Sequence, residues 1–378
     1  TARYGAAAGG AQTSALLFGG TGSPSFLSAT ETYDGTSYTT SPASLASGRN
    51  NLGGDGGNNA YLAVGGNVSG PAKTSNTEEY NQSSTVITGA VFATGGTANT
   101  ARRQMGYTTN SPQNDFMGYG GFSPGGFINN SETYNGASWS EGNNLNESKG
   151  QLAGAGTSSS AALAFGGNGN NANTEEYNGT SWSEQNNMNT GRYELGGAGT
   201  QTAGLAVAGE SASSSTTTLT EHYNGTSWTT SGTMNTARRE NDAAGTQTAA
   251  IVAGGGTPSG IANTETYNGS SWTTVNSKIR ATVAPRTMGG PTSQTAAVTA
   301  GGHDGSSGIV GTEQWNGTNF VTGPNMNQQR FSFTAGGSIA AGIVAFGDAP
   351  TPAMLKTSEE FTGETTALNV KRITTSTS

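Results

Sequence analysis

Few side chains in this sequence could carry out catalysis. The chain has no cysteine, which excludes disulfides, thiolate metal sites and cysteine nucleophiles. Its two histidines are His222 and His303. His222 stands in a repeated segment where other copies carry Thr, Glu or Gln, so a strand residue is favoured over a metal ligand. His303 precedes Asp304 in an expected loop and is kept as a candidate binding residue.

Acidic pairs are a second possible source of chemistry. Glu78-Glu79, Glu175-Glu176 and Glu359-Glu360 could supply the two carboxylates of a glycoside hydrolase. Each pair stands in a strand-like repeat, however, and neighbouring residues of a strand point to opposite faces. We therefore interpret the pairs as structural, and we expect no catalytic residues, no metal site and no cofactor.

Arginines and loop aromatics form the set for which we predict binding. Guanidinium groups bind carboxylates or acidic sugars through paired hydrogen bonds, and exposed rings stack on sugars or fill a partner's pockets. The alternative is that the loops only connect strands and the arginines brace neighbouring sheets. The candidate binding residues are Arg102, Arg103, Arg238, Arg239, Phe26, Phe122, Phe127 and His303.

The elements that must position these residues follow from an internal repeat. A Glu-x-aromatic segment occurs eight times, at intervals of 43 to 54 residues. A short apolar run that ends in small residues, usually Gly-Gly, precedes each copy, and an arginine or lysine precedes that run. The aromatics are Tyr33, Tyr80, Tyr134, Tyr177, Tyr223, Tyr267, Trp315 and Phe361. The basic residues are Arg3, Arg49, Arg102, Lys149, Arg192, Arg238, Arg286 and Arg330.

Each repeat is predicted to form four antiparallel strands, A to D. Strand A follows the basic residue, B ends in Gly-Gly, C carries the Glu-x-aromatic segment, and D begins at a Trp such as Trp182. Between C and D, Asn178-Gly179 favours a two-residue type I′ turn. That turn would place Tyr177 opposite Thr180 and would direct the Tyr and the Trp into the space between neighbouring sheets.

Composition and charge narrow the possible partners. The formal net charge of −8 provides no positive field for nucleic acid or an anionic membrane surface. No apolar run approaches the ~20 residues that cross a bilayer, so we expect no membrane insertion. The sequence shows no signal-peptide core and opens inside the first repeat, so an anchoring segment upstream is an open possibility.

The order of basic residue, apolar-Gly-Gly, Glu-x-Tyr-Asn-Gly, Trp and a following Met, as in Met188-Asn189-Thr190, resembles the kelch repeat over essentially the whole chain. Its recurrent Asn-Gly-Thr-Ser-Trp sequence and the segment from Gly363 to Asn369 resemble those of kelch-like proteins of tailed phages of marine cyanobacteria. The resemblance implies an all-β propeller of about eight four-stranded antiparallel blades in one domain, residues 1–378. The repeat units are approximately 1–45, 46–98, 99–145, 146–188, 189–234, 235–282, 283–326 and 327–378.

Two details of this expected ring can be checked. A last D strand near Leu368 to Ile373 would complete eight blades, so that the ring closes blade against blade without borrowing a strand. Seven blades, with one shared or unformed, is the alternative because the second repeat is irregular. The D-to-A and B-to-C connections should emerge on one face, which carries the variable loops, and short A-to-B and C-to-D turns on the other.

The kelch resemblance also raises enzyme hypotheses. Copper radical oxidases of this architecture need a Tyr crosslinked to Cys and two His ligands, and this chain lacks the cysteine. Sialidase-type propellers carry Asp-boxes, but here Asn or Asp directly precedes the Gly, so the spacing differs. A propeller glycosidase or oxidase therefore stays a distant alternative to a non-enzymatic protein.

We thus expect a phage virion structural or tail-associated propeller, located on the virion or outside cells. Its partners would be other virion proteins and a host receptor, glycan or protein, with several copies on a particle. The alternative is a kelch adaptor that binds a protein partner.

Overall fold

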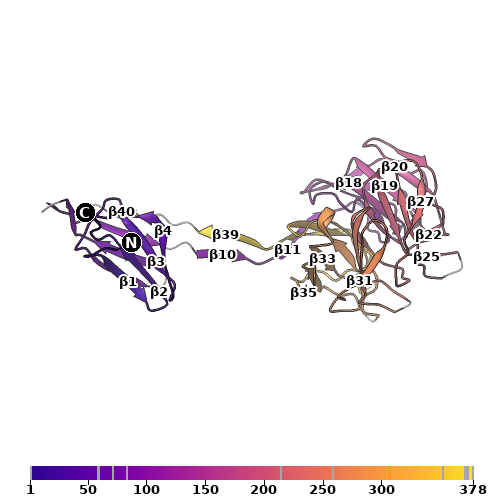
Figure 1. Ribbon diagram of the computed structural model, residues 1–378. Coiled ribbons are helices and arrows are strands. Elements are labelled where there is room, and N and C mark those ends of the chain that lie inside the picture. The colour runs from indigo at the N-terminus through magenta and orange to yellow at the C-terminus, as the bar shows by residue number, and fades with distance from the viewer. Residues whose placement is uncertain are drawn as a thin grey trace. The chain divides into compact units, whose positions relative to one another are not determined.

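The computed structural model describes residues 2–57, 60–69, 72–81, 84–212, 215–257, 259–305, 307–350, 353–369 and 374–376. The chain is all-β in these residues, with one short 3-10 helix, η1 (Gly290–Thr292) (Figure 1). It divides into two compact units, Thr1–Thr88 with Thr365–Ser378, and Gly89–Glu364. The expectation of one domain over residues 1–378 thus gives way to two units, which are described separately.

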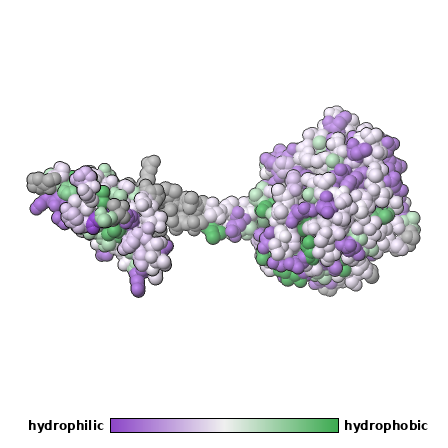
Figure 2. All heavy atoms as spheres, viewed as in Figure 1, coloured by the Kyte–Doolittle hydropathy of each residue, from purple (hydrophilic) through white to green (hydrophobic). Residues whose placement is uncertain are grey.

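Eight four-stranded antiparallel sheets form among the described residues, and each takes at least three strands from one repeat. Residues of intermediate hydropathy, with scattered hydrophilic ones, cover most of the visible surface of the second unit (Figure 2). The large apolar side chains are instead buried in clusters that join one sheet to the next. A chain poor in large apolar residues can therefore still bury a core, because the core is divided among many sheet interfaces.

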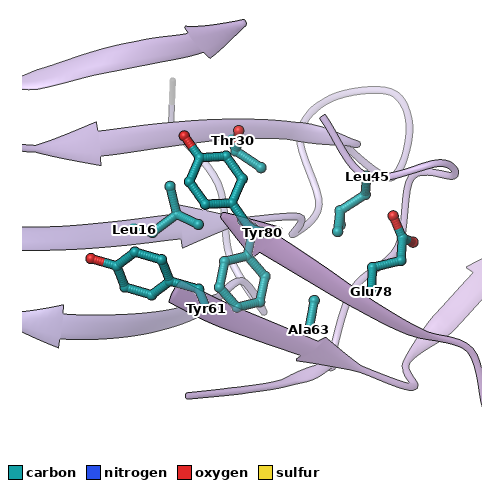
Figure 3. A pocket seen from close by; sticks show the side chains of 8 residues that line it. Leu16, Thr30, Leu45, Tyr61, Ala63, Glu78 and Tyr80 are labelled. Carbon is teal, nitrogen blue, oxygen red and sulfur yellow. The ribbon is translucent and has the colours of Figure 1, made fainter. Parts of the chain in front are cut away.

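The first unit holds the sheets of the first two repeats. The first sheet is β1 (Ala7–Ala11), β2 (Ser14–Phe18), β3 (Ala29–Tyr33) and β4 (Tyr38–Ser44). The second is β5 (Gly53–Gly57), β6 (Ala60–Val64), β9 (Thr77–Asn81) and β40 (Thr374–Ser376). Leu16 and Phe18 of the first sheet pack on Tyr61 and Ala63 of the second, with Tyr80 beside them (Figure 3).

The second unit holds six sheets. Those of repeats three to five are β12 (Gly106–Tyr107), β13 (Phe116–Tyr119), β16 (Ser131–Tyr134), β17 (Trp139–Gly142); β18 (Ala153–Ser158), β19 (Ala161–Phe165), β20 (Thr174–Tyr177), β21 (Trp182–Gln185); and β23 (Gly196–Gly199), β24 (Gly204–Val207), β26 (Thr220–Tyr223), β27 (Trp228–Ser231). Those of repeats six to eight are β28 (Ala243–Thr246), β29 (Ala249–Ala253), β30 (Thr264–Tyr267), β31 (Trp272–Val275); β32 (Arg286–Met288), β33 (Ala297–Ala300), β34 (Thr312–Trp315), β35 (Phe320–Thr322); and β36 (Thr334–Gly337), β37 (Ala341–Ala345), β38 (Thr357–Thr362), β11 (Val91–Thr97).

Short ladders accompany these sheets. Two lie within the connection between a second and a third strand: β7 (Asn67–Ser69) with β8 (Ala72–Lys73), and β14 (Phe122–Ser123) with β15 (Gly126–Phe127). A third pairs β22 (Arg192–Tyr193), which precedes a first strand, with β25 (Glu210–Ser211) in such a connection. A fourth, in the first unit, pairs β10 (Ser84–Thr88) with β39 (Thr365–Asn369).

The eighth repeat does not supply its own fourth strand. β11 pairs with β38, placing Phe92 opposite Phe361, so residues 91–97 complete the last sheet. The C-terminal β40 in turn completes the sheet of the second repeat by pairing with β9. The expected last D strand near Leu368 to Ile373 was therefore wrong in its pairing, since β39 joins β10, and residues 370–373 lie outside the described part. A strand is borrowed after all, because residues 91–97 belong to the second repeat in the sequence.

Contacts between first strands run around the second unit in order. β12 contacts β18, β18 contacts β23, β23 contacts β28, β28 contacts β32, β32 contacts β36, and β36 contacts β12. The sequence of contacts thus returns to its start after six sheets rather than eight. This arrangement is consistent with a propeller-like all-β fold.

One rule of packing governs all these interfaces. The trailing face of a sheet carries the last residue of its second strand and the residue two before it, such as Phe165 and Leu163. The leading face carries the intervening residues of that strand together with the paired aromatics, such as Tyr223 and Trp228. Within each unit the trailing face of a sheet packs on the leading face of the next repeat, and in the second unit the trailing face of repeat eight packs on repeat three.

The turn between the third and fourth strands differs from the predicted two-residue type. Tyr177 lies opposite Trp182, so four residues form the turn. The Asn178 side-chain oxygen accepts the N–H groups of Thr180 and Ser181 at 3.0 and 2.9 Å, and only the glycine, Gly179, takes a positive φ of 89°. The asparagine thus acts through its side chain, as in an Asx turn. Tyr and Trp share a face, as predicted, with ring centroids 5.1 Å apart.

Replacing Trp182 with Ala should lower the free energy of unfolding by roughly 3–5 kcal/mol, as for other core aromatics. The side chain is 6% exposed and donates its indole N–H to the Asn143 carbonyl at 3.0 Å, so truncation leaves both a void and an unpaired carbonyl. Denaturant unfolding measures the change. Val321→Ala, at an exposed strand position, is the control and should change little. Equal effects of the two substitutions would contradict the buried placement of the tryptophan.

Candidate functional site

Two predicted binding residues, Arg102 and Arg238, are fully buried and do not reach the surface. Arg102 donates to Glu132 at 2.7 Å and to the carbonyls of Gly120 and Asn130. Arg238 makes the equivalent contacts in its own repeat. Both arginines therefore act as braces and offer no guanidinium fork to a ligand, so their assignment as binding residues was wrong.

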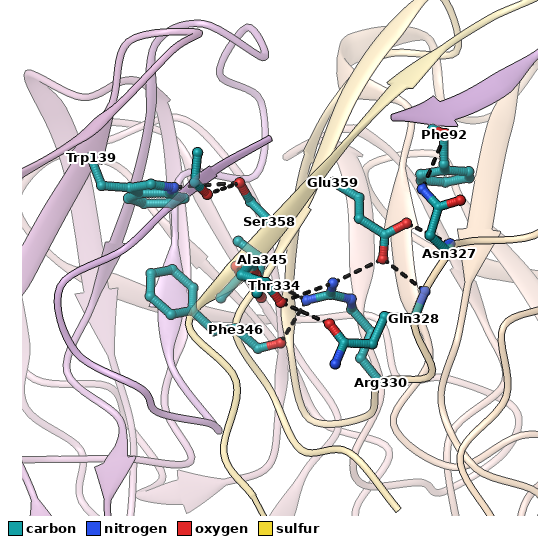
Figure 4. Close-up of polar contacts among 12 residues, drawn as sticks. Phe92, Trp139, Asn327, Gln328, Arg330, Thr334, Ala345, Phe346, Ser358 and Glu359 are labelled. Carbon is teal, nitrogen blue, oxygen red and sulfur yellow. Dashed lines mark hydrogen bonds and ion pairs between the residues drawn. The ribbon is translucent and has the colours of Figure 1, made fainter. Parts of the chain in front are cut away.

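The same buried pair recurs along the chain. In each case the basic residue at the head of a repeat meets the glutamate of the Glu-x-aromatic segment. Figure 4 shows Arg330, which donates to Glu359 at 2.9 Å and to the Phe346 carbonyl at 3.0 Å. Its glutamate also accepts the N–H groups of Asn327 and Gln328, from the incoming connection. The described pairs are Arg3–Glu31, Arg49–Glu78, Arg102–Glu132, Lys149–Glu175, Arg192–Glu221, Arg238–Glu265 and Arg330–Glu359.

The seventh repeat departs from this pattern, and the assignment of Arg286 as its head residue was wrong. Arg286 lies in β32 and donates to the carbonyls of Phe333 and Pro285. In its place the buried Lys278 donates to Thr282 at 2.7 Å. Burial lowers the pKa of Lys278 to about 8, while the nearby Glu313 opposes that shift.

Arg103, by contrast, reaches the surface. Its side chain is 35% exposed, pairs with Asp348 at 2.6 Å and lies over the Phe122 ring at 5.1 Å. Phe127, which is 38% exposed, packs edge-on against Phe122 with centroids 5.2 Å apart. The structure thus brings three predicted binding residues together in one cation–aromatic group.

Arg239 and His303 are partly exposed as well. Arg239 is 32% exposed and holds two carboxylates, Glu210 at 2.7 Å and Glu194 at 3.4 Å. His303 lies 4.0 Å from Glu240. Sequence reasoning missed both Glu194 and Glu240. The signal that could have found them is their place, two residues after the head residue of a repeat, as in Arg192-Tyr193-Glu194.

The residues at this place, with Ala284 at the corresponding position of the seventh repeat, form a backbone ring across the six repeats. All six have a positive φ between 48° and 56°. Five consecutive hydrogen bonds of 2.7 to 3.0 Å join them, each from the N–H of one to the carbonyl of its predecessor. The candidate surface is the group of Arg103, Phe122, Phe127, Arg239 and His303, of which Arg103 and Arg239 directly precede members of the ring. The members are Gln104, Gln151, Glu194, Glu240, Ala284 and Ser332.

A cavity of about 20 Å³ is lined by the members of the backbone ring. Asn241 lines it at 2% exposure, and neither polar atom of its side chain has a hydrogen-bond partner among the described residues. The volume suits a water molecule, which would satisfy that amide, and is too small for an organic ligand. A larger ligand would therefore have to bind outside this cavity.

Glu194 is the most perturbed acid of this surface. Burial raises its pKa from the ordinary 4.5 to about 7, and the nearby Glu240 carboxylate adds to the rise. Arg239 and the Gln151 amide, which donates at 2.8 Å, act in the opposite direction. The group can therefore hold or release a proton near neutral pH.

The remaining predicted residues lie elsewhere. Phe26 belongs to the first unit, where it lines a depression of about 380 Å³ with Pro24 and Val68. Phe26 therefore does not belong to the unit that carries the backbone ring. His222 is a half-buried residue of β26 and contacts the Tyr267 hydroxyl at 2.9 Å, which confirms its interpretation as a strand residue.

The opposite end of the six-sheet unit was expected to carry only short turns, and this was wrong for two repeats. The connection after β12 is long, and its Asn110 bonds to the carbonyls of Gly199 and Gly245 from two other repeats. The seventh repeat has the η1 connection. Together with the turn of repeat eight they line a pocket of about 470 Å³, within the usual range for small ligands.

Comparison with known proteins adds no family. No family model matches the chain, and no curated protein matches it. Within the described residues, no group of three or more His, Asp or Glu side chains is placed to hold a metal ion. No helix in that part of the chain is long and apolar enough to cross a membrane.

Glu265→Gln should lower the free energy of unfolding by roughly 3–5 kcal/mol, the cost of leaving one member of a buried ion pair without its partner. The substitution removes the charge opposite Arg238 while keeping the side-chain shape. Denaturant unfolding of the full chain measures it, with the exposed Glu141→Gln as the matched control. A loss no larger than that of the control would show that the pair does not hold the sheet together.

Glu194→Gln should stabilise the protein at alkaline pH and not at acid pH. Because the folded state binds the proton more tightly, the stabilisation from protonated Glu194 is present below about pH 4.5 and is lost as pH rises through about 7. The variant should therefore gain up to about 3 kcal/mol over the wild type above pH 7, and the two should converge near pH 4. Unfolding curves between pH 4 and 8 test this, with exposed Glu364→Gln as control. A difference independent of pH would contradict it.

Proposed function

We propose that this protein is a non-enzymatic binding protein of the kelch-propeller type. The six sheets of the second unit would be the blades, in place of the eight expected from the repeat count. Two observations support this: the contacts among first strands return to their start, and β11 from the front of the unit completes its last sheet. Completing one sheet with strands from both ends of a unit ties the ends together.

The observation that carries the binding role is the group of partly exposed cationic and aromatic side chains around the backbone ring. Arg103, Phe122 and Phe127 form one cluster, and Arg239 and His303 lie beside other members of the ring. Six rigid sheets support these groups, so little ordering entropy would be lost on binding.

The charged groups of this surface narrow the class of ligand that we expect it to bind. Arg103 and Arg239 already hold carboxylates of the protein itself, so an acidic sugar would have to displace them. Stacking on the exposed Phe127 and hydrogen bonding to neighbouring polar groups meet no such competition. We therefore favour a neutral glycan or a polar protein surface over an acidic one.

The proposed biological setting rests on the resemblance of the repeat sequence to the sequences of phage proteins. On that basis we propose a virion or tail-associated component that acts outside cells and contacts a host-surface glycan or another virion protein. Many copies on a particle would convert weak single contacts into firm attachment.

Phe127→Ala should weaken binding of the purified protein to cyanobacterial cells about tenfold, because it removes the exposed ring. Ile339→Ala is the matched control, since Ile339 is similarly exposed but stands in a turn at the opposite end of the unit. Phe127→Tyr should retain binding. If the control loses binding while a folded Phe127→Ala protein keeps it, the wrong face has been assigned. Capture of a defined protein that belongs neither to the virion nor to the host surface, with no glycan bound, would favour the adaptor alternative.

A further inference from the structure

In the described residues, the first unit contains two four-stranded sheets, and the outward face of each exposes apolar side chains. On its trailing face, Leu62 and Val64 are 37% and 42% exposed. On its leading face, Tyr38 is 60% exposed. Apolar side chains are visible on the surface of this unit in Figure 2.

The residues at the equivalent positions of the second unit are buried. The residues that correspond to Leu62 and Val64 are at most 1% exposed in each of the six sheets: Met117, Tyr119, Leu163, Phe165, Leu205, Val207, Ile251, Ala253, Val298, Ala300, Ile343 and Ala345. The tryptophans that correspond to Tyr38 are 6 to 7% exposed: Trp139, Trp182, Trp228 and Trp272. The register supports this correspondence, because Tyr38 pairs with Tyr33 as Trp182 pairs with Tyr177. The uncovered faces thus have the composition of buried interfaces without a partner sheet.

The two uncovered faces are complementary to each other. In two interfaces of the second unit, the last residue of the second strand on a trailing face meets the tryptophan of the next sheet: Tyr119 and Trp182 have centroids 4.8 Å apart, and Phe165 and Trp228 5.0 Å. The same rule would bring Val64 of one copy onto Tyr38 of another.

A polar contact follows the same rule. The Tyr223 hydroxyl donates to Glu176 of the preceding repeat at 2.9 Å, and Tyr134 donates to Glu360 at 2.5 Å. Glu79 corresponds to these glutamates, since it lies opposite Leu62 as Glu176 lies opposite Leu163. It is exposed, as expected of a group whose partner belongs to another copy.

We infer that the first unit associates with two further copies of this chain, the leading face of each packing on the trailing face of the next. Contacts of this head-to-tail kind close into a ring when the rotation between units allows it. Six sheets of the same repeat close in the second unit, so three copies of a two-sheet unit supply the number that closes. The inference does not depend on the proposed ligand.

The first test is the mass of the full chain in solution, measured by light scattering after size exclusion. Wild type should have three times the monomer mass of 37.9 kDa. Val64→Lys should be monomeric, because it buries a charge in the interface. Val321→Lys, the same change at a 49% exposed valine of the second unit, should remain trimeric. A monomeric, dimeric or tetrameric wild type would overturn the inference, as would a trimeric Val64→Lys protein.

A crosslink tests the geometry, since the chain has no cysteine of its own. The double variant Tyr38→Cys, Val64→Cys should form covalent dimers and trimers on mild oxidation. Each single variant should stay uncrosslinked, because each face meets the other face and not itself. Covalent dimers from either single variant would show a symmetric two-copy contact and overturn the head-to-tail ring. A double variant that is trimeric but never crosslinks would also overturn it.

Discussion

The buried ion pair between the head residue of a repeat and the glutamate of its third strand is the interaction on which this structure depends. One arginine, such as Arg238, joins the end of the second strand, the start of the third and the incoming connection, because the paired Glu265 also accepts the N–H groups of Asn235 and Thr236. Burying two charges gains little net free energy, whereas removing one partner is costly. The pair therefore acts mainly by fixing which segments meet, and it does so in the same way in almost every repeat.

With each sheet fixed in this way, the interfaces between sheets can be small. Alanines and glycines allow close approach, and the aromatic pairs fill the remaining space on one side of every interface. The interface is directional, since trailing faces meet leading faces, and a directional interface must either close into a ring or leave two open ends. The second unit closes, with repeat eight against repeat three. In the described part of the first unit, the two outward faces expose Tyr38, Leu62 and Val64, at positions whose equivalents in the second unit are buried.

The candidate surface is a consequence of the same construction. In the backbone ring, the residue two positions after each paired arginine or lysine, and Ala284 in the seventh repeat, takes a left-handed conformation and lines a shared cavity. Burial at one of these places raises the pKa of Glu194 toward neutrality, and the carboxylate of Glu240 at the next place adds to the rise. Arg103 and Arg239, one position before members of the ring, are partly exposed. Each directly follows a fully buried arginine, Arg102 or Arg238, so neighbours in the chain differ in exposure.

The sequence by itself determined the repeat, its four strands, the shared face of Tyr177 and Trp182, and the all-β class, because these depend on local spacing and alternation. It also gave Arg103, Phe122 and Phe127 as binding candidates, which the structure brings together, but it could not separate Arg103 from the buried Arg102, since exposure depends on which carbonyls and carboxylate surround a guanidinium. The register of the Asn-Gly turn required the side-chain hydrogen bonds of Asn178. Only the tertiary structure decided that residues 91–97 complete the last sheet and that six sheets, not eight, contact one another in sequence, because strand pairing between distant segments leaves no signal in the spacing of either one.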